Sequence, residues 1–369
     1  MHHATTLVTV PLSALGSPSW TLAPQRMVAL HRTLTDTNIC DFEPGLGEHL
    51  LNDVYIDRDA HLDAIELIAL PPLTRVLKGG DFAVLCGDRL IKEHFPVYWR
   101  GVPELLEAIA AEDACIDVEQ ETILLARFGI FTWGHWLGEL LPKAVLAEAR
   151  FPGRFMYMVP TEVLEDDSPE QPWVRILQSL QAYGIGCERL LPVDSERTYR
   201  FARAFSVSPV WSDRAVHPFA ATAMREGLQI PLQVTPEIKL AVRRVEDYGR
   251  TLDNWEQIEA VLVKKGFTIE TTGNLTFKDQ VDLFARASVV IGILGSDLTN
   301  LMYAPAGVQV ITLAPSNFGD YFFFALIQER KGTQTDLRGP VTTENQETAH
   351  RSAFHVDVVE FEKYLGKLA

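Results

Sequence analysis

Apolar residues in the C-terminal half of the chain alternate between short continuous runs and sets spaced at helical intervals. The continuous runs are rich in Val, Ile and Leu, as in strands of a parallel sheet that is buried on both faces. They predict strands over 238–244, 267–272, 288–293 and 308–315. The helically spaced sets predict helices over 254–266, 276–287, 296–307 and 320–332. This alternation predicts a doubly wound α/β domain whose ligand lies beyond the carboxyl ends of the strands.

Helix-end signals support this assignment. Asn254 is placed to N-cap the helix over 254–266, and Gly266 is placed to end it. Thr276 followed three residues later by Asp279 resembles a capping box at the start of the next helix. The closing segment 354–368 predicts a strand and a helix, which the pattern alone does not assign to a domain.

The N-terminal half is mixed and strand-rich at its start. Its pattern predicts strands within 81–91, 121–129 and 154–160, and helices over 101–113 and 171–185, the latter capped by Gly184. Two prolines and the lack of a helical period make 227–237 the candidate linker. We therefore expect an N-terminal α/β domain over 1–230, a Rossmann-like domain over 231–345, and an unassigned segment over 346–369.

Composition fits a two-domain globular chain and limits its partners. The chain has 369 residues, of which 47% are hydrophobic and 22% charged, with a formal net charge of −16. This charge argues against sequence-independent nucleic-acid binding, which requires Lys and Arg to replace counterions. A few local arginines can still hold a nucleotide diphosphate in an acidic protein.

The cysteines and the N-terminal stretch carry no targeting or metal signal. Cys40, Cys86, Cys115 and Cys187 are far apart, so we expect neither structural zinc nor a disulfide framework. The opening residues show no basic segment followed by a long apolar stretch, and no run approaches the ~20 apolar residues of a membrane-spanning helix. We expect a cytoplasmic protein without a transmembrane segment, able to form a homo-oligomer.

The loop after the strand over 288–293 contains small residues that could approach a phosphate. It reads Leu294, Gly295, Ser296, Asp297, Leu298, Thr299, Asn300. Main-chain N–H groups there could bind an anion, but the carboxylate of Asp297 would compete for the same helix end. The alternative is that Asp297 N-caps the helix and Asn300 completes the turn. The loop lacks GxGxxG, so a dinucleotide site is poorly supported.

Arginines follow the strand over 238–244. Arg243, Arg244 and Arg250, with Asn254, lie at the predicted carboxyl edge of the sheet, where Arg244 and Arg250 could clamp a diphosphate. The alternative is surface pairing with acidic neighbours, namely Glu246, Asp247 and Asp253.

His135 and Glu139 lie four residues apart in "GHWLGELLP" and share a face if the segment is helical. A carboxylate beside an imidazole fixes its tautomer. It also stabilises the positive charge that the ring gains when it acts as a general base and takes up a proton. Because Trp133 and Trp136 flank the pair, a hydrogen-bonded core histidine is the alternative.

These three segments, in this order, resemble glycosyltransferase family 61, the DUF563 group. The matching blocks are "GHWLGELLPK" (Gly134–Lys143), "RRVEDYGRTLDN" (Arg243–Asn254) and "VVIGILGSDLTNLMYAPAG" (Val289–Gly307), within a coverage of about residues 80–315. The resemblance implies a GT-B-like fold of two facing Rossmann-like domains with parallel sheets. It also implies inverting transfer from a nucleotide-sugar to a saccharide or glycan acceptor, usually without metal or other cofactor. Bacterial relatives are described as capsular polysaccharide or glycan biosynthesis proteins.

Site roles follow from this resemblance. His135, oriented by Glu139, or Glu139 itself, would be the catalytic base. The donor would be bound by a second set of residues: Arg244, Arg250, Asn254, Gly295, Ser296, Asp297 and Asn300.

One departure from the family pattern affects this hypothesis. The family's "HGA" histidine is Leu294 here, its alanine is Ser296, and the following glycine is Asp297. A catalytically inactive GT-B-like module that binds a glycan or partner is therefore an alternative. Another nucleotide-sugar enzyme, such as an epimerase, is a third.

Overall fold

The computed structural model describes most of the chain after residue 114 and selected segments before it. The described residues are 8–10, 20–22, 25–26, 29–32, 39–42, 54–57, 61–62, 65–79, 82–87, 89–91, 115–127, 129–165, 168, 171–212, 215–231, 237–244, 249–318, 322–345 and 351–368. The helix expected over 101–113 lies outside them.

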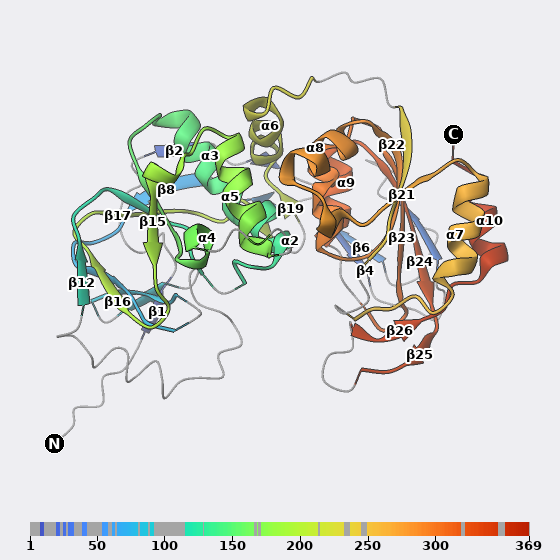
Figure 1. Ribbon diagram of the computed structural model, residues 1–369, viewed down its shortest axis with the longest axis horizontal. Coiled ribbons are helices and arrows are strands. Elements are labelled where there is room, and N and C mark those ends of the chain that lie inside the picture. The colour runs from blue at the N-terminus through green and yellow to red at the C-terminus, as the bar shows by residue number, and fades with distance from the viewer. Residues whose placement is uncertain are drawn as a thin grey trace. The chain divides into compact units, whose positions relative to one another are not determined.

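The chain divides into two units. Unit 1 comprises Met1–Pro24 and Asp63–Val210, and unit 2 comprises Gln25–Leu62 and Trp211–Ala369 (Figure 1). Residues 25–62, which we assigned to the N-terminal domain, thus cluster with unit 2. The expected boundary near residue 230 follows α6 (Pro218–Gly227), which also belongs to unit 2.

Unit 1 contains two six-stranded sheets. One has the order β15 (Leu190–Val193), β14 (Met156–Pro160), β13 (Thr122–Leu124), β17 (Ala204–Val207), β8 (Ile65–Ala69) and β2 (Trp20–Leu22), and its first four strands are parallel. The other has the order β1 (Val8–Val10), β11 (Arg89–Ile91), β10 (Val84–Cys86), β9 (Thr74–Val76), β16 (Thr198–Phe201) and β12 (Cys115–Val118). The predicted strands at 121–129 and 154–160 are confirmed as β13 and β14.

Helices connect the parallel strands of unit 1, which confirms the alternation predicted there. They are α2 (Trp133–His135), the π-helix η4 (Trp136–Leu140), α3 (Leu141–Arg150), α4 (Glu162–Glu165), α5 (Pro172–Ala182) and the 3₁₀ helix η5 (Cys187–Arg189). The buried Trp136 indole donates to Ser179 Oγ at 2.8 Å, so η4 is tied to α5.

Unit 2 is built on a sheet with the order β21 (Thr268–Glu270), β20 (Ile238–Val242), β22 (Ala287–Ile293), β23 (Gln309–Pro315), β24 (Thr333–Gly339) and β5 (Ile39–Phe42). β21 through β24 pair in parallel, and β5 pairs antiparallel with β24. Because β5 pairs with β24, the latter does not present an open edge. The predicted parallel sheet is confirmed.

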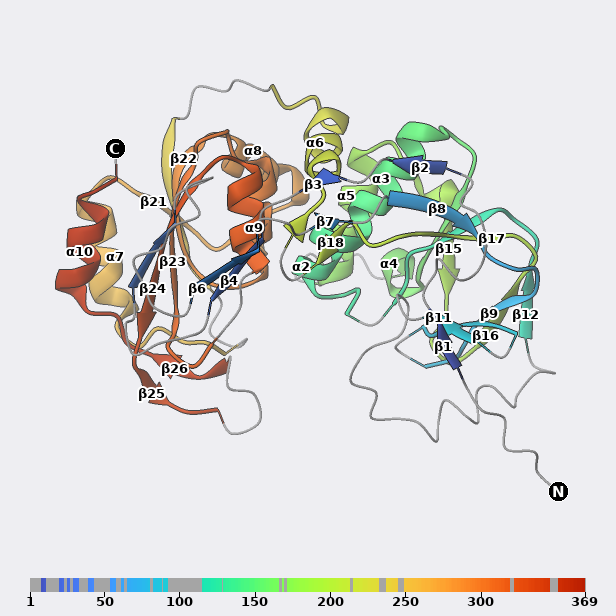
Figure 2. The same cartoon turned by 180° about the vertical axis from the view of Figure 1, so that it is seen from behind.

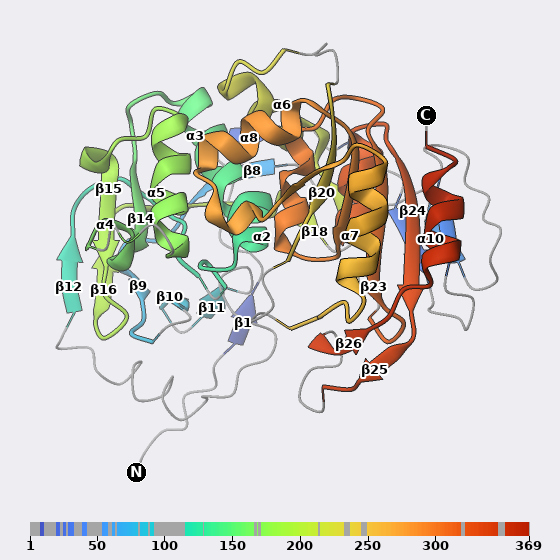
Figure 3. The ribbon, with the colours of Figure 1, turned by 45° about the vertical axis from the view of Figure 1, so that its right-hand side comes forward.

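Helices cover both faces of the unit 2 sheet. α7 (Trp255–Lys264) and α10 (Val358–Leu365) lie on one side, and α8 (Phe277–Ala285) and α9 (Phe322–Glu329) lie on the other (Figures 1 and 2). Figure 3 shows α7 and α10 next to each other. Their apolar side chains pack with Val289, Ile291 and Ile311 in one core, so the closing segment belongs to unit 2.

The remaining elements of unit 2 are short. They are β3 (Gln25–Arg26), β4 (Ala29–Arg32), β6 (Val54–Asp57), β7 (His61–Leu62), β18 (Trp211–Ser212), β19 (Ala215–Val216), η7 (Thr272–Asn274), η8 (Ser296–Tyr303), β25 (Val341–Thr343) and β26 (Ala353–Phe354). The helix expected over 296–307 is present as the 3₁₀ helix η8.

Most predicted helix ends are confirmed, with one correction. Gly184 and Gly266 follow α5 and α7 with φ of +78° and +77°, and Thr276 Oγ1 accepts from the Asp279 N–H at 3.2 Å. Asn254 occupies the N-cap position of α7, but its side chain makes no capping hydrogen bond.

A buried polar stripe runs along β24. Its members are Gln334, Asp336 and Arg338, which share one face of the strand because they occupy every second position. Asp336 accepts from Arg338 Nε and from Thr312 Oγ1, each at 2.7 Å, and Gln334 Nε2 donates to Thr312 Oγ1 at 2.9 Å. The side chains of Arg338 and Asp336 are only 3% and 4% exposed. The stripe therefore places a hydrogen-bonded ion pair inside an apolar sheet.

We expect Asp336→Asn to lower the free energy of unfolding by about 3–5 kcal/mol, because it leaves the Arg338 charge buried without its carboxylate. Urea denaturation followed by circular dichroism measures the loss. Glu237→Gln is the control, since Glu237 pairs with Arg286 at 3.5 Å on the surface, where ion pairs contribute little. Equal losses in the two variants would contradict the expectation.

Candidate functional site

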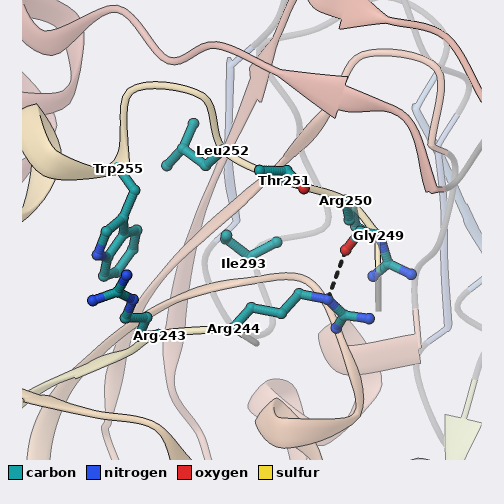
Figure 4. Close-up of a pocket in the computed structure, with 8 residues that line it drawn as sticks. All are labelled: Arg243, Arg244, Gly249, Arg250, Thr251, Leu252, Trp255 and Ile293. Carbon is teal, nitrogen blue, oxygen red and sulfur yellow. Dashed lines mark hydrogen bonds between the residues drawn. The ribbon is translucent and has the colours of Figure 1, made fainter. Parts of the chain in front are cut away.

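The arginines of unit 2 line a pocket at the carboxyl ends of β20 and β22. The chain leaves β20 toward β21 on one side and leaves β22 toward β23 on the other. Such a reversal of strand order opens a crevice where doubly wound proteins bind ligands. The lining residues, drawn in Figure 4, are Arg243, Arg244, Gly249, Arg250, Thr251, Leu252, Trp255 and Ile293.

Arg244 extends across the pocket toward the loop that follows β22. Its Nε donates to the Gly249 carbonyl at 3.0 Å, as Figure 4 shows. A Cβ built on Gly295 would overlap Nη1 of Arg244 and lie 3.3 Å from its Cζ. The guanidinium group of Arg244 therefore lies against the main chain at Gly295, in space that a side chain at this position would occupy.

Arg250 is held in an unusual main-chain conformation. Its φ is +62°, a left-handed value that costs a non-glycine residue about 1 kcal/mol or more. Its main-chain N–H donates to Arg351 O at 3.0 Å, and its Nη1 donates to the carbonyl of Leu294. The side chain is largely buried, with its Cζ 4.2 Å from the centre of the Phe318 ring. The surrounding contacts thus fix both the turn and the guanidinium group.

Arg243 forms an ion pair with Glu259 on α7. Its Nη1 lies 3.8 Å from Glu259 Oε2, the oxygen that also accepts from the Trp255 indole. Of the acidic neighbours considered for surface pairing, Glu246 and Asp247 lie outside the described residues. Asp253 accepts from Thr342 Oγ1. Arg244 and Arg250, rather than Arg243, therefore come together beside Gly295.

The loop after β22 is organised differently from the capping alternative. Gly295 is the N-cap residue of η8, so the expectation that Asp297 caps this helix is wrong. Asp297 instead accepts from Thr272 Oγ1 at 2.5 Å, because the loop packs against η7. Asn300 does complete the turn, since its Nδ2 donates to the Asp297 carbonyl at 3.0 Å. Ser296 is half-buried next to Gly295.

Two predicted binding residues are engaged inside the fold. The buried Asn254 donates from Nδ2 to Val356 O at 2.7 Å and accepts from Val356 N at 3.1 Å, which ties α7 to the segment before α10. The fully buried Asn300 also donates to Gln280 Oε1 at 2.9 Å. These hydrogen bonds support the loops around the pocket, and a direct ligand contact stays a prediction for both residues.

In unit 1, a π-helical turn presents His135 and Glu139. The N–H of Leu141 bonds to the carbonyl of Trp136, five residues earlier, and such π-turns are frequent at functional sites. His135 Nδ1 lies 2.5 Å from Glu139 Oε1. The His135 side chain is 45% exposed, whereas Trp136 is fully buried. The core-histidine alternative is therefore wrong: the apolar neighbours pack inward while the imidazole reaches solvent.

Arg127 completes this cluster, and the sequence reasoning missed it. Its Nη2 forms an ion pair with Glu139 Oε2, so both carboxylate oxygens are engaged. Arg127 lies just after β13, and a charged residue at the carboxyl end of a predicted parallel strand was the available signal. A Cβ on Gly129 would lie 3.0 Å from His135 Cδ2, so this turn packs directly on the imidazole.

The environment of Glu139 decides its charge. Burial favours the neutral acid, but the hydrogen bond with His135 and the charges of Arg127 and Lys143 outweigh it and lower the pKa of Glu139 below its usual 4.5. An ionised carboxylate can only accept a hydrogen bond, so Nδ1 of a neutral His135 carries the proton. Nε2 is then the ring nitrogen that can accept one.

The residues that the structure describes carry neither a metal-binding cluster nor a membrane-spanning helix. No group of three or more His, Cys, Asp or Glu side chains there could hold a metal ion. No helix among those residues has the length and apolar character needed to cross a bilayer.

Comparison with known proteins agrees with the resemblance found in the sequence. None of the curated proteins matches the chain. The family model described as Glycosyltransferase 61 matches residues 133–311, which include His135 and Glu139 but not Arg127, together with the arginine pocket and the loop after β22. This match supports assignment of the segment to glycosyltransferase family 61, and with it a glycosyltransferase activity that uses a sugar donor and an acceptor.

Proposed function

We propose that this protein is an inverting glycosyltransferase that moves a sugar from a nucleotide-sugar donor to a saccharide or glycan acceptor in polysaccharide biosynthesis. The observation that carries the proposal is the approach of Arg244 and Arg250 to Gly295 at the carboxyl ends of β20 and β22. Unit 2 is then the donor-binding domain and unit 1 the acceptor-side domain.

The donor diphosphate would be bound by the two guanidinium groups. Their planar N–H forks match phosphate oxygens, and they stabilise the charge that develops on the leaving diphosphate. The main-chain N–H groups of Gly295 and Ser296 would add hydrogen-bond donors without a bulky side chain. Because the arginines supply the positive charge, the proposal needs no divalent metal.

His135 is assigned the role of general base. Its Nε2 accepts the proton of an acceptor hydroxyl as that oxygen bonds to the anomeric carbon. The bond from this carbon to the donor phosphate oxygen breaks, and its electron pair leaves on the diphosphate. Attack opposite the leaving group inverts the anomeric configuration. Glu139 stabilises the imidazolium and holds the ring, since both its oxygens are already engaged.

A second candidate function is a non-catalytic module that binds a glycan or a partner. The observation that favours it is the burial of Leu294, 2% exposed, where the family pattern has histidine. A thermal-shift screen against UDP- and GDP-linked sugars separates the two, because ligands that bind only the folded state raise its stability. Stabilisation by a donor supports the enzyme, and no response to any donor supports the module.

We expect His135→Ala to reduce the transfer rate by about 10²–10⁴-fold, the usual contribution of a general base. The protein should stay folded, because the imidazole is half exposed. His355→Ala is the control, since His355 is a half-buried histidine of unit 2. Near-normal turnover of His135→Ala with an identified donor and acceptor would remove the assigned role.

Glu139→Gln tests whether Glu139 is ionised in the folded protein. A lowered pKa stabilises the fold fully above the usual value of 4.5, and this contribution disappears as the pH falls through the folded pKa. The stability difference between wild type and Glu139→Gln should therefore be largest above pH 4.5 and shrink at lower pH. Urea unfolding over a pH series measures it. A difference that grows with acidification would mean that Glu139 is protonated and acts otherwise.

Arg250→Met should weaken donor binding by about 10- to 100-fold, the cost of losing a charged hydrogen bond. Calorimetry with the donor found in the screen measures the loss. Arg286→Met is the matched control, because Arg286 precedes β22 and so lies at the amino end of this strand, away from the pocket at its carboxyl end. Equal affinities for Arg250→Met and wild type would place the donor elsewhere.

A further inference from the structure

The ring of Phe318 lies close to two guanidinium groups in unit 2. Its ring centre is 4.2 Å from Cζ of Arg250 and 5.9 Å from Cζ of Arg338. The residue follows β23 by three positions and is only half-buried. A cation over an aromatic face is attracted by the ring, most strongly where water is excluded. The side chain therefore interacts with the largely buried Arg250 without being a core residue itself.

Two hydrogen bonds hold the main chain of Phe318. Arg338 Nη1 donates to the Phe318 carbonyl, and the Phe318 N–H donates to Pro315 O at 3.1 Å. Arg338 is in turn held by Asp336, within the buried stripe on β24. Hydrogen bonds thus run from the sheet interior to the main chain of Phe318, whose ring packs on Arg250.

These contacts restrict a side chain that is otherwise flexible. A free arginine samples many rotamers, and ordering it on binding costs affinity. Arg250 is restrained at two points, the Leu294 carbonyl through Nη1 and the Phe318 ring at Cζ. Its guanidinium plane is therefore set before any ligand arrives.

We propose that Phe318 is a positioning residue, which holds the Arg250 guanidinium in the orientation that binds a diphosphate. This inference rests on the proposed function, because it assigns Arg250 to a phosphate ligand. Phe318, which is not among the residues that line the pocket, would act through Arg250.

The experiment measures the affinity of the full-length protein for inorganic pyrophosphate, UDP and GDP by calorimetry. The variants are Phe318→Leu, Phe318→Trp, Arg250→Met and the double variant Phe318→Leu/Arg250→Met. Phe151→Leu is the matched control, because Phe151 is a half-buried phenylalanine beneath Arg154, at 5.4 Å, in unit 1. Circular dichroism and thermal melting establish that each variant is folded.

We expect Phe318→Leu to weaken binding about tenfold. The variant loses a partly desolvated cation–π contact and the restraint that this contact places on the Arg250 side chain. Phe318→Trp should retain wild-type affinity, because it keeps an aromatic face. The double variant should bind no more weakly than Arg250→Met, and Phe151→Leu should bind as wild type.

Three results would overturn the inference in distinguishable ways. Wild-type affinity in Phe318→Leu, with loss in Arg250→Met, would reject the positioning role and leave the proposed function standing. Equal losses in Phe318→Leu and Phe318→Trp would mean that Phe318 only fills space. Failure of the wild type to bind any of the three probes would reject the proposed donor site and the inference with it.

Discussion

The parallel pairing of β20 with β22 is the constraint on which the candidate donor site depends. It aligns Val242 with Gly292, so the residues after both strands emerge at one edge of the sheet. Arg244 and Gly295, 51 positions apart in the chain, meet there because parallel strands end together. The absence of a side chain on Gly295 then allows a guanidinium group to approach the main chain. Without this register the arginines would have no common pocket.

The rest of unit 2 supports that edge through polar contacts inside an apolar sheet. The Asp336–Arg338 pair is nearly free of solvent, and burying two charges is unfavourable unless hydrogen bonds compensate. Thr312 supplies one such bond, and Nη1 of Arg338 donates to the Phe318 carbonyl in the loop after β23. The buried pair therefore links the sheet interior to the position of Arg250. The stability of this unit and the geometry of its pocket depend on the same residues.

In unit 1, a largely buried helical segment leaves the side chains of His135 and Glu139 partly exposed. The π-turn inserts an extra residue between Trp136 and Leu141, and this changes which side chains face inward. Trp136 and Leu137 are buried, while His135 and Glu139 stay partly exposed and in contact. Arg127 and Lys143 then keep the carboxylate ionised. An imidazole held by an ionised carboxylate is suited to accept a proton at its other nitrogen.

The sequence by itself determined the features that depend on near neighbours. The alternation of strands and helices after residue 237, the Thr276 cap, the glycine stops and the His135–Glu139 pair all follow from residues within a few positions of one another. Only the tertiary structure decided which distant groups meet: Asn254 with Val356, Asp297 with Thr272, Arg127 with Glu139, and Arg250 with Phe318. The β5 strand joins β24 across most of the chain for the same reason. Local periodicity and capping are set by main-chain geometry over one or two turns, whereas these contacts depend on strand register and packing, which no short stretch of sequence encodes.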